Sequence, residues 1–167
     1  MKNNGKHFAY LDIETTGLSP YASELTVIGI HIENGSDTVV QIIGDEISRA
    51  GLIKAMGNVR MLYTYNGSRF DLPFIREKLN IDLTDCCAHT DLMYSCWQKN
   101  LKGGLKAVER QLGIERKLTD VDGLVAVQLW TSYKQNGCAN SLNKLLEYNK
   151  EDVLNLKHLR KILKVCT

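Results

Sequence analysis

The stretch F-A-Y-L-D-I-E-T-T-G, residues 8 to 17, places two acidic residues inside an otherwise apolar, strand-like run. These residues are Asp12 and Glu14, and side chains two apart in a strand point to the same face. A carboxylate without a partner is costly to bury. Phe8 and Tyr10 precede the acids on that face, which argues against a fully solvated edge. The segment is therefore either a half-exposed strand end or a buried strand whose acids have a function.

The composition is typical of a globular protein that forms one domain over residues 1–167. The chain is 44% hydrophobic and 24% charged, with a formal net charge of +2 that argues neither for nor against nucleic acid. It has no apolar stretch of membrane-spanning length, and its first residues lack the apolar core of a signal peptide. We therefore expect a cytoplasmic protein.

The five cysteines do not form a regular pattern. An odd number without repeated spacing is a poor disulfide framework. Cys86, Cys87, His89 and Cys96 crowd together, but no second closely spaced ligand pair completes a zinc site. Buried or incidental thiols are the favoured interpretation, with metal binding as the alternative.

The order of strand-like and helical segments predicts an α/β fold. Asn34-Gly35 between two β-rich runs is a strong hairpin signal, so the first three strands should form an antiparallel meander. Strand–helix alternation follows, which implies a mixed five-stranded sheet flanked by helices. We expect strands at 7–14, 26–32, 38–43, 59–65 and 88–91, and helices at 45–56, 73–79, 92–99, 104–112, 122–135 and 140–164.

A second acidic feature follows the fourth expected strand, in Y-N-G-S-R-F-D from residue 65 to 71. Asp71 stands just before a helix with Pro73 in its first turn, so helix capping alone could explain it. Capping does not explain why Asn66 and Phe70 accompany Asp71 at the end of a strand. Loops at such ends often carry functional residues.

A third acidic feature lies on the last expected helix. Asp152 falls within its apolar face, and Tyr148 lies one turn earlier at the edge of that face. An acid on a buried face needs a partner, and a salt bridge to a core arginine or lysine is the alternative to a functional role.

If these acids converge, their charges must be neutralised. Two unit charges about 4 Å apart repel by about 4 kcal/mol at an effective dielectric constant near 20. Divalent cations would remove this repulsion, and ligands that are all oxygen suit Mg²⁺ or Mn²⁺. Two such ions can activate a water molecule and stabilise the leaving oxygen in phosphodiester cleavage.

The three motifs together resemble a known family. D-I-E-T-T-G-L (12–18), Y-N-G-S-R-F-D (65–71) and Y-N-K-E-D (148–152) are similar to the motifs of DEDD-type 3′–5′ exonucleases in the RNase H-like superfamily. The tyrosine four residues before the last aspartate matches the tyrosine subtype, DEDDy. H-T-D-L-M-Y and G-L-K-A-V-E-R-Q-L-G-I resemble the middle region of YprB-type RNase H-like domains. The resemblance covers nearly the whole chain and implies an RNase H-like fold.

The resemblance also implies roles for individual residues. Asp12, Glu14 and Asp152 would hold a first metal ion. Asp12 would bridge to a second, which Asp71 would help to hold, partly through water. Tyr148 would orient the attacking water, because a phenol is a poor general base at neutral pH. The expected substrate-binding residues are Thr15, Thr16, Gly17 and Leu18 at the 3′-terminal nucleotide, and Asn66 and Phe70 along the path of the strand.

The expected function is that of a two-metal-ion 3′–5′ exonuclease that releases nucleoside 5′-monophosphates. Single-stranded DNA is the favoured substrate, although the motifs do not separate DNA from RNA. A protein partner could supply targeting or processivity. The alternatives are an RNase H-like endonuclease and a catalytically idle nucleic-acid-binding module.

Asp91 and a set of basic residues can each be interpreted in two ways. Asp91 matches an acid common in the family, but it could equally be a strand-end or N-cap residue. Other basic residues could contact phosphates, although solvated surface charges are the favoured interpretation. They are Lys99, Lys102 and Lys106, and on the last helix Lys157, Arg160, Lys161 and Lys164.

Overall fold

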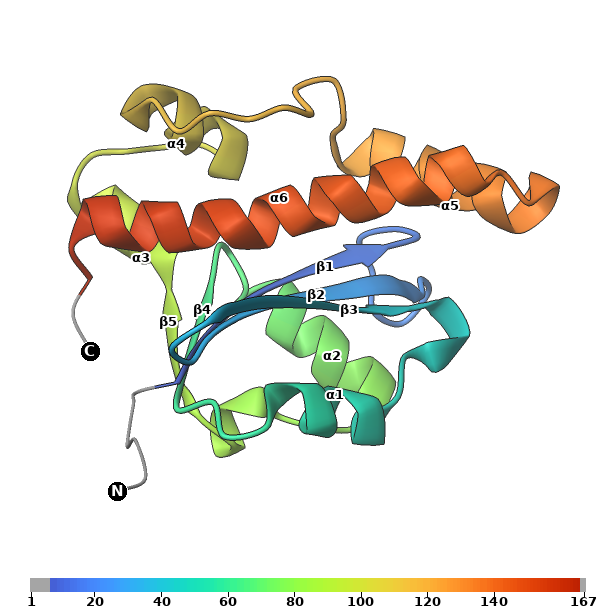
Figure 1. Cartoon of the computed structure of the whole chain (residues 1–167), viewed down its shortest axis with the longest axis horizontal. Coiled ribbons are helices and arrows are strands. Elements are labelled where there is room, and N and C mark those ends of the chain that lie inside the picture. Colours follow the sequence, from blue (N-terminus) through green and yellow to red (C-terminus); the bar gives the residue numbers. More distant parts are fainter. Residues whose placement is uncertain (1–6, 166–167) are drawn as a thin grey trace.

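The computed structural model describes residues 7–165 and contains a five-stranded sheet with helices on both faces (Figure 1). The ends of the predicted domain, residues 1–6 and 166–167, lie outside the described part. The order of the strands across the sheet is β3-β2-β1-β4-β5. The strands are β1 (Phe8–Thr15), β2 (Leu25–Glu33), β3 (Asp37–Ile43), β4 (Met61–Thr64) and β5 (Ala88–Asp91).

The helices alternate with the later strands and then continue as far as Leu163. They are η1 (Gly44–Glu46), α1 (Arg49–Met56), α2 (Asp71–Leu79), η2 (Leu83–Asp85), α3 (Leu92–Gln98), α4 (Leu105–Leu112), α5 (Gly123–Asn136) and α6 (Ala139–Leu163).

The sheet is mixed, as the sequence predicts. Strands β1, β2 and β3 form an antiparallel meander, whereas β4 and β5 run parallel to β1. The predicted turn lies between β2 and β3, and Gly35 there has a φ of +93°, a conformation that glycine adopts without a steric penalty.

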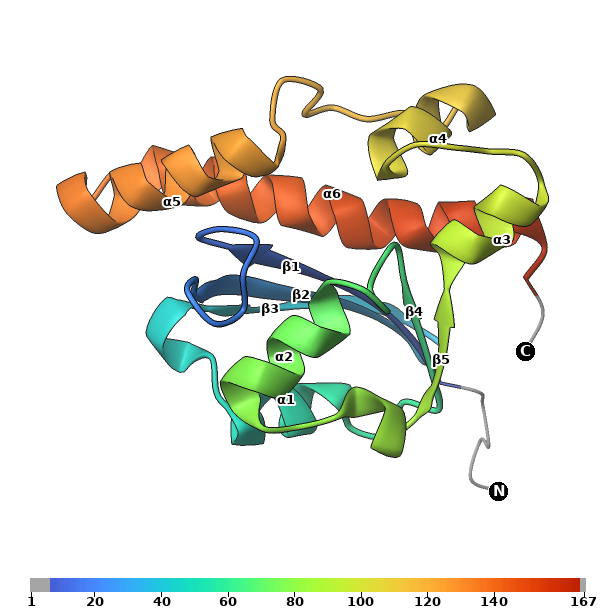
Figure 2. The same cartoon turned by 180° about the vertical axis from the view of Figure 1, so that it is seen from behind.

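The residues of β1 alternate between two apolar cores. Ala9, Leu11 and Ile13 pack with residues of α1 and α2, while Tyr10 packs with residues of α3 and α6. Figures 1 and 2 show α1 and α2 on one face of the sheet and α6 across the other. Because side chains two apart share a face, Asp12 on β1 faces α6.

Helix α6 covers the centre of the sheet with the apolar face that the sequence predicts. Most of the predicted apolar residues of this face are buried, namely Leu145, Val153, Leu156, Leu159 and Leu163. This burial positions Asp152, which lies on the same face, against the sheet.

The prediction of solvated charges is wrong for two basic residues of α6. Lys157 is buried and pairs with Glu33, at 3.3 Å between Nζ and Oε1, and with Asp37. The Arg160 guanidinium lies 5.1 Å from the centre of the Tyr63 ring. These side chains attach α6 to strands of the sheet rather than face solvent.

Two predicted boundaries are also wrong. The expected helix at 45–56 begins only at Arg49, because Ser48 adopts an extended conformation and caps α1 by accepting a hydrogen bond from the Gly51 amide at 3.1 Å. The expected strand at 59–65 is shorter, since only Met61–Thr64 pairs with its neighbours. Among residues 7–165, no helix combines the length and apolar character needed to cross a membrane.

Candidate functional site

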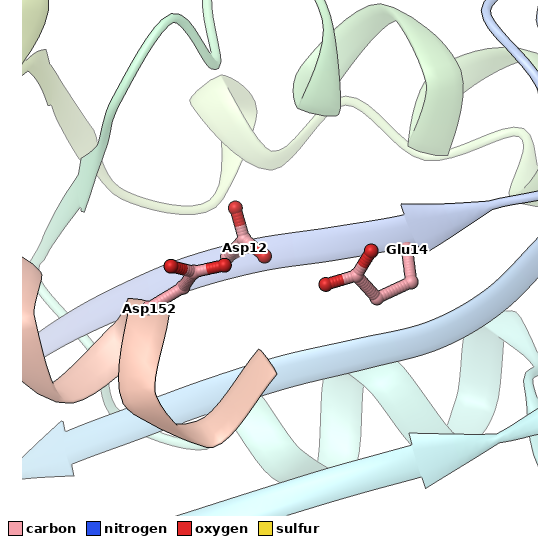
Figure 3. Close-up of side chains that lie close together, drawn as sticks. All are labelled: Asp12, Glu14 and Asp152. Atoms are coloured by element: carbon pink, nitrogen blue, oxygen red, sulfur yellow. The ribbon is translucent and has the colours of Figure 1, made fainter. Parts of the chain in front are cut away.

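Three carboxyl groups converge between the sheet and α6. Asp12 and Glu14 come from β1 and Asp152 comes from α6, and one oxygen from each lies within 4.8 Å of the others. Figure 3 shows the carboxyl group of Glu14 pointing along the strand toward the other two. Glu14 and Asp152 are buried and Asp12 is half-buried. The strand that carries two of the acids is therefore a core strand.

Burial and mutual repulsion raise the pKa values of these acids. Removal from water, followed by the charge of Asp152, raises the pKa values of Asp12 and Glu14 well above their usual range. Burial raises the pKa of Asp152 to about 6, although Arg116 opposes the change. Ionising all three acids together therefore requires additional positive charge.

The chemistry of the donors fits a hard divalent cation. All three groups offer oxygen, which suits Mg²⁺ or Mn²⁺. Glu14 Oε1 is buried without a hydrogen-bond partner, as expected of an oxygen that binds an ion. Within residues 7–165 this is the only group of carboxylate, imidazole or thiol ligands close enough to hold a metal.

Asp71 lies beside this group rather than within it. Its Oδ1 accepts a hydrogen bond from the Ile13 amide at 3.1 Å. Helix capping does not explain Asp71, because it is the first residue of α2 and Phe70 occupies the N-cap position. Burial raises the pKa of Asp71 to about 7 against the effect of the Ile13 hydrogen bond, and the charge of Asp71 in turn raises the pKa values of Asp12 and Glu14.

Tyr148 is buried against the acidic group from α6. Burial raises the pKa of its phenol far above the usual value, and the charges of Asp152 and Glu14 add to this effect. The phenol therefore stays neutral at physiological pH. It can donate or accept a hydrogen bond, but it cannot serve as a phenolate base.

Arg116 is a residue of this site that the sequence did not reveal. Its guanidinium pairs with Asp152 and donates two hydrogen bonds to Glu109, each 2.7 Å long. Asn155 donates a further hydrogen bond to Glu109 at 3.0 Å. The salt-bridge alternative for Asp152 is therefore confirmed, and Asp152 also belongs to the acidic group. Nothing in the sequence around Arg116, which lies between two helices, predicts this pairing.

Asn149 is a second residue whose role was not foreseen. Its Nδ2 donates to Asp12 Oδ2 at 3.1 Å, and its Oδ1 accepts a hydrogen bond from Gln41 Nε2 at 3.0 Å. Asn149 lies within the third motif, directly after Tyr148, and it is fully buried. Its place in that motif was the signal that could have identified it as a residue of the site, because a buried amide needs hydrogen-bond partners.

The two arms of a groove meet at the acidic group. The first arm, which we call the loop arm, has a volume of about 500 Å³, and the second, the α4 arm, has a volume of about 560 Å³. Asp12, Gly123, Tyr148 and Asp152 line both. The loop arm is also lined by Thr15, Thr16, Gly17, Leu18, Phe70 and Leu124, and the α4 arm by Tyr65, Asn66, Met93, Gly103, Gly104 and Lys106.

The residues expected at the substrate are thus divided between the arms. Phe70 lines the loop arm, whereas Asn66 lines the α4 arm. The loop after β1 is held by the Thr15 hydroxyl, which donates to the Gly17 carbonyl at 2.7 Å, and by Thr16 Oγ1, which accepts from the Glu24 amide at 2.8 Å. Leu18 is 86% exposed at the edge of the groove, which leaves its side chain free to contact a ligand.

Asp91 orders the loop that carries Asn66. Its two oxygens accept hydrogen bonds from the amides of Asn66 at 2.8 Å and Ser68 at 3.0 Å. It also caps α3 by accepting from the Met93 amide at 3.1 Å, which confirms the N-cap interpretation. Asp91 therefore shapes the α4 arm without joining the acidic group.

The cysteine and histidine residues near β5 make ordinary contacts. His89 Nε2 lies 2.9 Å from Thr64 Oγ1, and the Cys87 thiol lies 3.5 Å from the Leu83 carbonyl oxygen. Cys86 is exposed, and Cys96 is buried. None of these residues belongs to a group that could bind a metal ion in the described part of the chain.

Comparison with known proteins identifies the family. The chain matches the RNase H superfamily over residues 9–164. The uncharacterized protein YprB of Bacillus subtilis (strain 168) is 28% identical over an alignment 170 residues long, which covers 92% of this chain and 41% of YprB. The chain thus spans less than half the length of that relative.

Solved structures share the fold. The family B DNA polymerase of Pyrobaculum calidifontis has a TM-score of 0.71 at 16% identity, covering 96% of this chain and 25% of the polymerase. NrnC of Brucella melitensis with bound Mg²⁺ has a TM-score of 0.63 at 20% identity, covering 98% of this chain and 74% of NrnC. At such identities the likeness shows the fold alone.

Proposed function

This chain belongs to the RNase H superfamily, and from that premise we propose that residues 1–167 act as a divalent-metal-dependent 3′–5′ exonuclease of the DEDDy subtype. The observation that carries the proposal is the buried acidic group of Asp12, Glu14 and Asp152 at the junction of a two-armed groove. A buried carboxylate group with an unpartnered oxygen needs cations, and a groove on both sides admits a chain molecule.

Four carboxyl groups of the chain would hold the cations. Asp12, Glu14 and Asp152 would hold a first ion. Asp12 and Asp71 would hold a second, Asp71 partly through water. Two divalent cations supply an activated water and stabilise the leaving oxygen in an in-line cleavage. NrnC, which shares the fold, was solved with Mg²⁺ and in a separate structure with pGG, in keeping with such ligands.

The other residues of the site would position the attacking water and bind the substrate. Tyr148 stays neutral and positions the attacking water by a hydrogen bond. The loop from Thr15 to Leu18 receives the 3′-terminal nucleotide, and Phe70 offers an aromatic face on which any base can stack. This sequence-tolerant contact favours single-stranded nucleic acid, with DNA as the expected substrate and nucleoside 5′-monophosphates as products.

The test is cleavage of a 5′-labelled single-stranded oligonucleotide in Mg²⁺ or Mn²⁺. A 3′–5′ exonuclease produces a ladder that shortens from the 3′ end, and Asp12→Asn should abolish it. Asp120→Asn is the matched control, because Asp120 is an exposed acid paired with Lys144 and does not line the groove. Intact DNA and RNA in every metal would overturn the proposal, and cleavage of a circular strand would indicate an endonuclease.

A longer protein or a partner can place this domain on its substrate. The chain covers 41% of YprB, so more than half of YprB lies outside the related segment. We propose that targeting or processivity, if the activity needs them, comes from such additional protein.

A further inference from the structure

The two arms of the groove differ in charge. The residues that line the loop arm include no lysine or arginine, whereas Lys106 lines the α4 arm. Lys106 lies in the first turn of α4 and is half-buried. A cation at this place favours a phosphate in the α4 arm over the loop arm.

Lys106 has no acidic partner among the ion pairs of residues 7–165. Its Nζ lies 4.8 Å from the centre of the Tyr148 ring. The neighbouring cation, Arg116, is already engaged by Glu109 and Asp152. Burial and the charge of Arg116 lower the pKa of Lys106, although Asp152 opposes this effect. Lys106 is therefore the cation of this site that is available to a ligand.

A strand that binds across the junction must place one nucleoside in each arm. With the scissile phosphate at the acidic group and the 3′-terminal nucleoside in the loop arm, the nucleoside on the 5′ side enters the α4 arm. The next phosphate of the strand then lies beside Lys106. We propose that Lys106 binds the phosphate one linkage 5′ of the scissile linkage, which makes single strands longer than a dinucleoside monophosphate the better substrates. This inference rests on the proposed function.

The inference can be tested with one neutral linkage. An oligonucleotide carries a methylphosphonate at the linkage next to the terminal one, and the release of the first 3′ nucleotide is measured. For wild-type protein we expect kcat/KM to fall about tenfold, the size of one hydrogen bond to a charged group. The kcat/KM of Lys106→Met on the normal strand should be lower than that of wild type by a similar factor. It should not fall further on the methylphosphonate strand.

Lys134→Met provides the matched control. Lys134 also lies over an aromatic ring, with its Nζ 5.8 Å from the centre of the Trp130 ring, and it lines neither arm. This variant loses the same charge but should respond to the methylphosphonate as wild type does. Lys106→Arg should restore much of the loss, because it keeps the positive charge. The inference would be overturned if the methylphosphonate lowered kcat/KM by the same factor in Lys106→Met as in wild type.

Binding gives a readout that does not depend on cleavage. In the Asp12→Asn background, the affinity for the normal strand is measured as a function of salt. Lys106→Met should reduce the slope of log K against log salt by about 0.7, the value for one phosphate contact on a single strand. An unchanged slope would refute the role of Lys106 even in a protein that cleaves, whereas a reduced slope without cleavage would refute only the proposed function.

Discussion

Arg116 supplies positive charge to the buried acidic group of Asp12, Glu14 and Asp152. It is buried, pairs with Asp152 and is itself held by Glu109. This arrangement explains how a core strand can carry Asp12 and Glu14 before any ion binds. The guanidinium compensates part of the negative charge, and protonation of the raised-pKa acids compensates more.

Replacing Arg116 by methionine should therefore destabilise the metal-free protein. Breaking a buried ion pair leaves Glu109 and Asp152 without a counter-charge, and such losses cost about 3–5 kcal/mol. Urea denaturation in EDTA measures the loss, and saturating Mg²⁺ should recover part of it. Arg76→Met is the control, since Arg76 is 61% exposed in its pair with Asp82 and should change stability by less than about 1 kcal/mol. Equal effects of the two substitutions would show that Arg116 has no special role.

The raised pKa values of the acids predict how stability depends on pH. Asp152 and Asp71 have folded pKa values of about 6 and about 7, above the ordinary value of 3.8. Between pH 3.8 and these raised values, the folded protein therefore binds more protons than the unfolded chain, and its stability falls as the pH rises. In EDTA we expect a lower Tm at pH 8 than at pH 5, with the loss beginning below pH 5 and levelling off above about pH 7.

Asp152→Asn should make this pH dependence shallower, because one of the titrating groups is removed. Added Mg²⁺ should also oppose it, since the ion binds the deprotonated acids. Circular dichroism melting curves at several pH values measure both effects. A metal-free Tm that rises from pH 5 to 8 would contradict the pKa shifts.

At the scale of elements, the site depends on how closely α6 approaches the sheet. Gly29 pairs with Asp12 across β1 and β2, and a Cβ on Gly29 would lie 2.1 Å from Asn149 Oδ1. The absence of a side chain thus lets Asn149 reach Asp12 from α6. We therefore expect the glycine and the asparagine together to set the separation between Asp12 and Asp152.

Gly29→Ala should therefore push α6 from the sheet. We expect a loss of about 1–3 kcal/mol, the usual cost of overpacking a core, together with weaker nuclease activity. Chemical denaturation of Gly29→Ala, Asn149→Ala and the double variant measures their coupling. The double variant should lose less than the sum of the single losses, because Asn149→Ala makes room for the new methyl group. Additive losses would mean that the contact does not set the packing.

Local patterns predicted the elements well where one periodicity dominated. The Asn34-Gly35 turn and the apolar face of α6 were clear signals, because each depends on residues close in sequence. The start of α1 was missed, since Ser48 caps the helix within a segment whose apolar spacing continues through it. The role of Lys157 was missed because its partners, Glu33 and Asp37, lie on distant strands.

At the scale of the whole molecule, the same distinction separates the foreseen site residues from the others. Asp12, Glu14 and Asp152 were out of place in apolar patterns, so their convergence could be predicted before the fold was known. Arg116 and Glu109 meet them only through the chain's return from α4 to α6, which no local pattern encodes.

Cation binding should stabilise the molecule as a whole, because it joins β1 to α6. An ion present at about a hundred times its Kd contributes about 2.7 kcal/mol, which corresponds to a rise in Tm of about 5–10 °C for a domain of this size. Differential scanning fluorimetry with and without Mg²⁺ at pH 8 measures the shift. It should disappear in Asp12→Ala but persist in Asp120→Asn. A shift of the same size in both variants would indicate nonspecific ion effects.

Metal binding by the buried carboxyl groups is tested most directly by counting the Mn²⁺ ions that the metal-free protein binds, using electron paramagnetic resonance during a titration at pH 8. We expect wild type to bind up to two ions per chain and Mg²⁺ to displace them, whereas the combined Asp12→Ala and Asp152→Ala variant should bind none at the same concentrations. Equal Mn²⁺ binding by wild type and the variant would contradict the claim that these buried carboxylates form the metal site.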